Sequence, residues 1–120
     1  MPEFKHNGKS YNNGVELALD LIGGKWKMPI LWRIKEKPKR YGEIKRSLPR
    51  TSHKMLAQQL QELEKEGFIK RKVFPTVPPA VEYSITAKGQ QTIPVIEALR
   101  DFGEKIRKGG NRKGTDEKKT

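Results

Sequence analysis

The side chains of this sequence that could do chemistry at a regular spacing lie between Ser52 and Gln61. They carry hydroxyl, imidazole, ammonium and amide groups, which can hydrogen-bond to phosphates and to the edges of bases. Residues three, four and seven positions apart share a face of an α-helix, so a helix here would bring these groups together. The candidates are Ser52, His53, Lys54, Gln58 and Gln61.

The residues of a catalytic or metal site are missing from the sequence. The chain has no cysteine, which excludes disulfides, thiolate metal sites and a thiol switch of its own. Its two histidines, His6 and His53, have no metal-ligating neighbour at a useful spacing. No nucleophile, base and orienting group can be assembled with any specificity. We therefore expect no enzyme activity, no metal and no cofactor.

The segment that must position these groups reads as a helix from Ser52 to Glu66. Leucines at spacings of four and three, Leu56, Leu60 and Leu63, form one apolar stripe. Ser52 is a good N-cap, and Gly67 suits the left-handed residue just past the end. The start is basic and the end acidic, so the N-terminal half should face a polyanion. An ordinary amphipathic surface helix remains the alternative.

A second, shorter helix is predicted over residues 42–48, with Ile44 and Leu48 facing inward and Pro49 closing it. The turn of Pro49, Arg50 and Thr51 leads straight to Ser52. Two helices joined by so short a connection, the second with a polar and basic start, form a helix-turn-helix. Further candidates for contacts to a nucleic-acid backbone around this motif are Lys39, Arg40, Tyr41, Arg50 and Thr51.

Residues 68–74 and 81–86 are rich in strand-forming residues and flank a proline-stiffened loop, which predicts a hairpin. A hairpin directly after a helix-turn-helix is the wing of a winged helix. Lys70, Arg71 and Lys72 place basic side chains on both faces of its first strand. They would either contact a nucleic-acid backbone or protect a solvated edge strand from aggregation.

Helices are also predicted over residues 14–22 and 25–35, with Pro29 in or just after the first turn of the second. A last helix, capped by Thr86 and kinked at Pro94, extends past Ile106. The first and last helices carry more apolar surface than one buried face requires, which predicts a two-fold dimer. The candidate interface comprises Leu17, Leu21, Ile93, Ile96, Leu99, Phe102 and Ile106.

The whole chain reads as one α+β, mostly α domain over residues 14–107, with an N-terminal arm (1–13) and a disordered basic tail (108–120). The formal net charge of +12 makes nucleic acid the leading partner, ahead of an anionic membrane surface or an acidic protein. The sequence shows no signal peptide and no apolar run of about 20 residues, so we expect a soluble, cytoplasmic protein.

Three blocks of the sequence resemble winged-helix transcription regulators of the HxlR type, relatives of the MarR group. The blocks are LDLIGGKWK (19–27), SHKMLAQQLQELE (52–64) and VPPAVEYSIT (77–86). The resemblance implies a homodimer that binds a pseudo-palindromic promoter site, as a repressor or an activator. Two positions depart from the family. Asn13 stands where many members have a reactive cysteine, and Ala80 stands where the wing tip often has an arginine.

We therefore expect a sequence-specific regulator of double-stranded DNA, with Ser52 and Lys54 on phosphates and His53, Gln58 and Gln61 at base edges. Two other binding functions remain open, namely sequence-indifferent nucleic-acid binding and a winged helix used for protein docking. An unidentified small-molecule effector could bind between the first and last helices, where Tyr11, Trp26 and Phe102 could meet. Plain interface packing is the alternative there.

Overall fold

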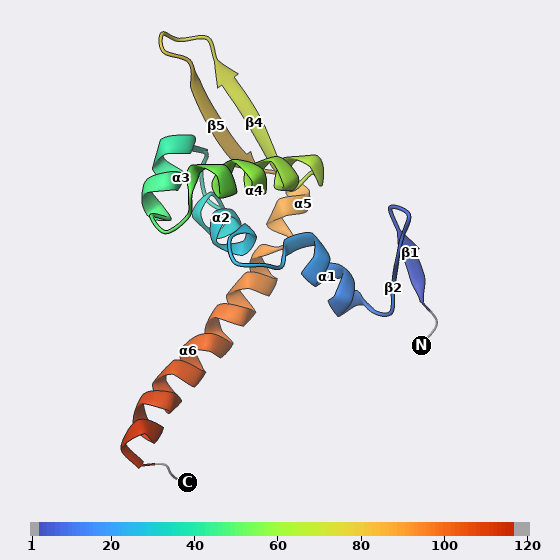
Figure 1. Ribbon diagram of the computed structural model, residues 1–120, viewed down its shortest axis with the longest axis vertical. Coiled ribbons are helices and arrows are strands. Elements are labelled where there is room, and N and C mark those ends of the chain that lie inside the picture. The colour runs from blue at the N-terminus through green and yellow to red at the C-terminus, as the bar shows by residue number, and fades with distance from the viewer. Residues whose placement is uncertain (1–2, 117–120) are drawn as a thin grey trace.

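The computed structural model describes residues 3–116, with side chains through residue 109 (Figure 1). The chain forms six helices and five strands within these residues. They are β1 (Phe4–His6), β2 (Lys9–Tyr11), α1 (Gly14–Ile22), α2 (Lys27–Arg33), β3 (Lys39–Arg40), α3 (Tyr41–Ser47), α4 (His53–Lys65), β4 (Ile69–Phe74), β5 (Ala80–Ile85), α5 (Ala87–Gln90) and α6 (Ile93–Asp116).

One hydrophobic core joins α2, α3 and α4 to the base of the sheet. Leu56, Leu60 and Leu63 of α4 are at most 1% exposed, as their spacing predicted. They pack in one cluster with Ile30 and Leu31 of α2. Truncating any one of these leucines to alanine would cost about 2–5 kcal/mol, so α4 is held firmly from behind.

The ends of α4 confirm the two predicted boundary signals. The Ser52 hydroxyl accepts a hydrogen bond from the amide of Met55 at 3.0 Å, which satisfies one free donor of the first turn. At the other end Gly67 has a φ of +82°, a conformation that glycine adopts without strain. The amide of Phe68 then donates to the carbonyl of Leu63, which closes the helix.

The wing is part of a three-stranded antiparallel sheet with the order β3-β5-β4. Its predicted two-stranded hairpin is present, with Arg71 opposite Tyr83 and Lys72 opposite Glu82. The third strand, β3, was not predicted. Lys39 and Arg40 pair with the other edge of β5, and two residues are too short a segment to show a period of two.

The chain after the sheet forms two helices where the sequence predicted one kinked helix. The Thr86 hydroxyl caps only the single turn of α5, and α6 starts afresh at Ile93. Pro94 lies in the first turn of α6, where its missing amide costs nothing. A Cβ at Gly89 would lie 2.1 Å from the carbonyl oxygen of Phe68, so only glycine lets α5 pack this closely.

The helix α6 also extends further than predicted. It continues through Asp116, whereas the predicted tail began at residue 108. Each added residue of a helix that is already nucleated gains a backbone hydrogen bond, which favours extension. Residues 117–120 of the predicted tail lie outside the described residues.

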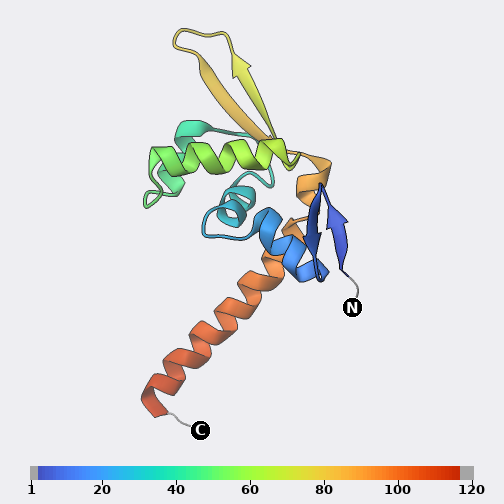
Figure 2. The ribbon, with the colours of Figure 1, turned by 45° about the vertical axis from the view of Figure 1, so that its right-hand side comes forward.

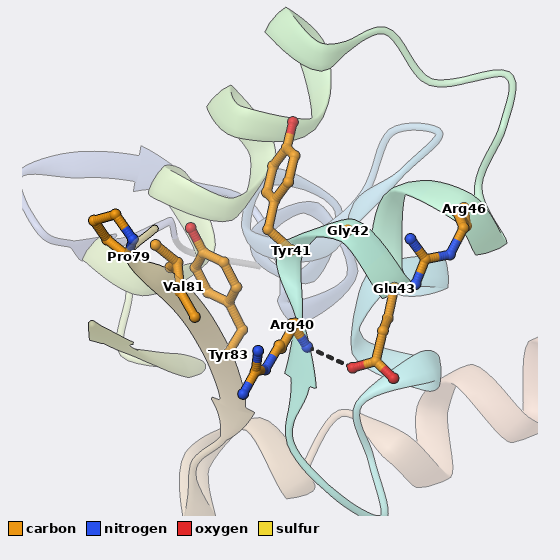
Figure 3. Close-up of a pocket in the computed structure, with 9 residues that line it drawn as sticks. Arg40, Tyr41, Gly42, Glu43, Arg46, Pro79, Val81 and Tyr83 are labelled. Carbon is orange, nitrogen blue, oxygen red and sulfur yellow. Dashed lines mark hydrogen bonds between the residues drawn. The ribbon is translucent and has the colours of Figure 1, made fainter. Parts of the chain in front are cut away.

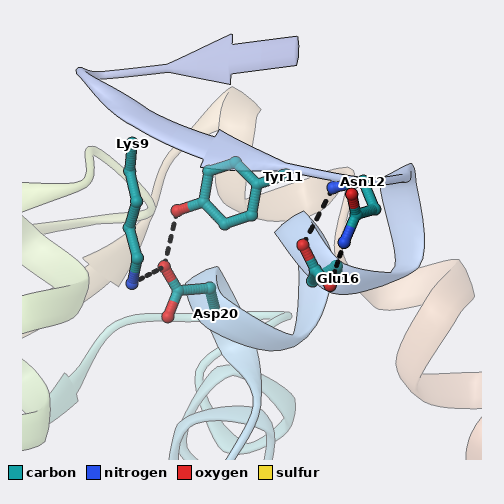
Figure 4. Close-up of polar contacts among 5 residues, drawn as sticks. All are labelled: Lys9, Tyr11, Asn12, Glu16 and Asp20. Carbon is teal, nitrogen blue, oxygen red and sulfur yellow. Dashed lines mark hydrogen bonds and ion pairs between the residues drawn. The ribbon is translucent and has the colours of Figure 1, made fainter. Parts of the chain in front are cut away.

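The predicted N-terminal arm contains a small hairpin, formed by β1 and β2, that packs against α1 (Figure 4). Tyr11 is 6% exposed and donates a hydrogen bond to the Asp20 carboxylate at 2.6 Å. Lys9 reaches the same carboxylate oxygen at 3.1 Å. The hydrogen bond to Asp20, with burial, raises the pKa of Tyr11 to about 12. It also lowers the pKa of Asp20, together with Lys9.

The molecule is elongated, with principal extents of 60 × 41 × 25 Å. The β4-β5 hairpin and α6 project from opposite sides of the helical body in both views (Figures 1 and 2). Among residues 3–116, no helix combines the length and apolar character that crossing a membrane requires. The helix-turn-helix, α3 and α4, lies at the foot of the wing.

Candidate nucleic-acid-binding surface

The outer face of α4 presents the side chains that the sequence selected. The leucine stripe faces the core, which leaves the opposite side of the helix in solvent. The candidate residues that are exposed on or just before this helix are Arg50, Ser52, His53, Lys54, Gln58 and Gln61. The first half of α4 therefore offers hydroxyl, imidazole, ammonium and amide groups on a rigid support.

Thr51 has to be removed from the candidate set. It is 2% exposed, and its hydroxyl has no hydrogen-bond partner among the described residues. The amide of Thr51 donates to the carbonyl of Leu48, which holds the turn between α3 and α4 closed. The sequence predicted the turn and made Thr51 a candidate for contact with a nucleic-acid backbone, but this tight turn directs its side chain into the core.

Gln58 is held in place by a chain of contacts from α2. The ammonium of Lys27 lies 2.6 Å from one carboxylate oxygen of Glu62, and the amide nitrogen of Gln58 donates to the other at 3.2 Å. The hydrogen bond from Lys27 lowers the pKa of Glu62, so this carboxylate is charged and can only accept. The amide nitrogen of Gln58 must therefore face Glu62. Among the described residues nothing else hydrogen-bonds to its oxygen or its second N–H, and these two groups are the pair that reads adenine.

His53 is also held by a partner, at the start of α4. Its Nδ1 lies 2.9 Å from the hydroxyl of Tyr41, the first residue of α3. The two rings stack with their centroids 5.8 Å apart and an interplanar angle of 19°. This contact spans the helix-turn-helix and joins the start of its first helix to the start of its second.

A shallow basic cleft of about 460 Å³ lies between α3 and the sheet (Figure 3). Arg40 and Arg46 line it together with Tyr83 and the loop before β5. The carboxylate of Glu43 accepts a hydrogen bond from the amide of Arg40 at 2.8 Å, which lowers the pKa of Glu43 and fixes the first turn of α3. No signal in the sequence pointed to Arg46, because only the fold brings it into the same cleft as Arg40.

The three basic side chains of β4, Lys70, Arg71 and Lys72, are exposed. Exposure is required both for contact with a nucleic-acid backbone and for protection of an edge strand. Lys70 and Lys72 alternate with Arg71 along β4, so they project from the opposite face of the sheet. Lys72 lies opposite Glu82, and Arg40 flanks Glu82 on its other side. Two basic residues therefore surround one acidic residue on that face, and the wing is basic overall.

The apolar surface left exposed differs in part from the predicted interface. Ile96 is only 7% exposed, while Leu21 and Ile93 pack against the core of their own chain. These three face inward because α1 and the start of α6 close over the core. We define the α6 stripe as Val95, Leu99, Phe102 and Ile106, which are 46–64% exposed. On α1, Val15 and Leu19 are exposed, and the predicted Leu17 is half-buried.

The three aromatic residues proposed to form an effector site do not meet in one cavity. Tyr11 is buried against Asp20, and Trp26 packs against the core. Phe102 is 64% exposed on the α6 stripe. The geometry therefore supports the interface-packing alternative for Phe102.

The described geometry is that of a winged helix-turn-helix, and the comparisons with known proteins agree with it. The family model described as HxlR-like helix-turn-helix matches residues 21–110, three quarters of the chain. The chain belongs to the HxlR-like helix-turn-helix family. This HxlR-like protein is thus a DNA-binding transcriptional regulator, as the sequence predicted.

Two relatives are described as helix-turn-helix-type transcriptional regulators. A helix-turn-helix-type transcriptional regulator from Halalkalibacterium halodurans is 48% identical over 107 residues, which cover 88% of this chain and 95% of the relative. One from Methanothermobacter thermautotrophicus is 45% identical over 94 residues, covering 78% and 72%. The likeness extends across most of the HxlR-like chain and includes the whole helix-turn-helix.

A solved structure supports the fold independently. The redox regulator HypR in its oxidized form superposes with a TM-score of 0.72 at 41% identity, covering 76% of this chain and 94% of that one. The HxlR-like protein described here has no cysteine, so thiol oxidation cannot be transferred to it from this likeness.

Proposed function

We propose that two copies of this regulator bind a pseudo-palindromic promoter site, with one α4 in each of two successive major grooves. The centres of such grooves are about 34 Å apart. The observation that carries the proposal is the exposed, hydrogen-bonding first half of α4, which three buried leucines hold in place. The α6 stripe, together with Val15 and Leu19, supplies the apolar surface for pairing.

Each predicted contact then has a distinct role in the complex. Ser52 and Lys54 would bind phosphates beside the major groove, and His53, Gln58 and Gln61 would meet base edges. The remaining basic groups would bind the flanking backbone, and they are Lys39, Arg40, Arg46, Arg50, Lys70, Arg71 and Lys72. Such a protein acts where the chromosome is, which in a prokaryote is the cytoplasm.

Selection of bound fragments from the host's own genomic DNA tests this proposal. We expect the recovered fragments to share an inverted repeat whose half-sites lie about one helical turn apart. A random duplex should compete only weakly against such a fragment at physiological salt. Equal competition by random DNA would instead identify a sequence-indifferent packaging protein, and failure to bind DNA even at low salt would identify a docking module.

Two single substitutions separate base contacts from backbone contacts. Gln58→Ala should weaken binding to the selected site by about 1–3 kcal/mol and relax the preference at one base pair. Lys70→Ala should weaken binding to all sequences alike. Equal losses on specific and random duplex for Gln58→Ala would contradict its role.

If about six to ten phosphates are contacted, wild-type affinity should fall by about three to five decades between 50 and 200 mM salt.

A further inference from the structure

The stacked pair of Tyr41 and His53 can be assigned a role that exposure alone does not suggest. Both residues were candidates for direct DNA contact. The Tyr41 hydroxyl, however, lies within hydrogen-bonding distance of two atoms of His53, Nδ1 at 2.9 Å and the carbonyl oxygen at 3.5 Å. The shorter contact has the better distance, so the hydroxyl is already engaged within the protein.

The hydrogen bond between the Tyr41 hydroxyl and Nδ1 can run in either direction, depending on the tautomer of His53. Burial and the neighbouring Tyr83 raise the pKa of Tyr41, so its phenol keeps its proton and can donate. A neutral imidazole has one nitrogen that accepts and one that carries hydrogen. When Nδ1 accepts from Tyr41, the hydrogen must be on Nε2.

The fold keeps the tyrosine in place for this contact. The Tyr41 ring packs against the hydrophobic core and points away from Arg40 and Glu43 in the basic cleft (Figure 3). His53 itself is exposed and is the first residue of α4, next to the capping Ser52. Tyr41 is thus an anchored group, and His53 is the one that reaches solvent.

We propose that Tyr41 is a positioning residue, whose hydroxyl fixes the ring of His53 so that Nε2–H is presented outward as a hydrogen-bond donor. A donor at this place matches phosphate oxygens and the N7, O6 and O4 acceptors of the major groove. Nε2 would otherwise be an acceptor in part of the molecules. This inference rests on the proposed function only for the identity of the surface that Nε2–H meets.

The first test measures the imidazole nitrogens of His53 directly, in the absence of DNA. Nitrogen-15 NMR, recorded at increasing pH until the resonances of the ring no longer change, observes the neutral imidazole. In the wild type the Nδ1 and Nε2 resonances should be widely separated, as in a single tautomer. In Tyr41→Phe, which keeps the stacked ring, they should move toward each other. Unchanged resonances would overturn the proposal.

A matched control comes from Tyr83, the other tyrosine of the same cleft. Tyr83 is more deeply buried than Tyr41, and Tyr83→Phe removes its phenol in the same way. The resonances of His53 should stay where they are. If Tyr83→Phe moved them as much as Tyr41→Phe does, the effect would be a general disturbance of the cleft. The positioning role would then fail.

A double-mutant cycle on the selected DNA site provides the second test. Tyr41→Phe should lower the affinity about two- to tenfold, the effect of one hydrogen bond. In the His53→Ala background the same change should have no further effect. Equal losses in both backgrounds would show that Tyr41 contacts DNA itself. The NMR result needs no DNA, so a failure of this inference can be distinguished from a failure of the proposed function.

Discussion

At the scale of single residues, burial determines what a polar side chain can do. Thr51 and Ser52 are neighbours with similar hydroxyl groups, yet one is 2% exposed and the other lies in solvent as a helix cap. Their different environments follow from the tight turn after Leu48. The sequence showed both hydroxyls beside a basic helix start and could not tell them apart.

Thr51→Val should stabilise the protein and leave DNA binding unchanged. A buried hydroxyl without a partner costs about 1–3 kcal/mol, and valine has nearly the same shape without that group. We expect the free energy of unfolding in urea to rise by about 1 kcal/mol. A loss of DNA affinity at unchanged stability would show that this hydroxyl turns outward.

Tyr11→Phe should remove a pH-dependent part of the stability. The raised pKa of Tyr11 means that its contribution is complete below pH 10 and is lost as the pH rises toward 12. The lowered pKa of Asp20 means that its contribution is present above pH 3.8 and is lost as the pH falls below that value. Thermal unfolding followed by circular dichroism should therefore give a higher melting temperature for the wild type than for Tyr11→Phe at neutral pH. The two melting temperatures should converge at strongly acidic and strongly alkaline pH. A difference in melting temperature that does not change with pH would contradict the mechanism.

At the scale of elements, local signals predicted α4 well because several of them agree. A cap, a leucine stripe and a terminal glycine all mark the same segment. The local signals gave a wrong prediction where only one of them marked a segment. Thr86 was correctly identified as a cap, but it caps only the single turn of α5, because α6 starts afresh at Ile93 with Pro94 in its first turn. The contact between Lys27 and Glu62 joins residues 35 positions apart, and the contact between Tyr41 and His53 joins residues 12 positions apart, so no local pattern shows them. Only the hydrogen bond from Gln58 to Glu62 has a local helical spacing, of four residues.

Two substitutions of Ser52 should separate its effect on α4 from its effect on DNA. Ser52→Ala loses the cap and should lower the free energy of unfolding by about 1 kcal/mol. Ser52→Asp keeps a good cap and should fold as stably as the wild type, but its negative charge should repel a phosphate. Denaturant unfolding and DNA titration of both variants measure the two effects. Normal DNA affinity in Ser52→Asp would exclude a phosphate beside this position.

At the scale of the whole molecule, the exposed α6 stripe predicts association. Phe102→Glu should shift the protein toward the monomer in sedimentation velocity, because it places a charge in an apolar contact. Affinity for the full site should fall by about 10²–10⁴, since the two half-sites are no longer bound together. Asp101→Asn, on the same helix but outside the stripe, should change neither property. A dimer that persists in Phe102→Glu would show that the interface lies on another surface of the molecule.

The length of α6 has a consequence for the operator. Its 24 residues span about 36 Å, so two such helices can pair along several turns. Where they cross would set how far apart the two reading helices lie. A slip by a single turn, about 5.4 Å, corresponds to between one and two base-pair steps of about 3.4 Å. Relatives with the same α4 could thus favour different gaps between identical half-sites. The helix that sets the spacing, α6, and the helix that contacts the bases, α4, are separate parts of the chain.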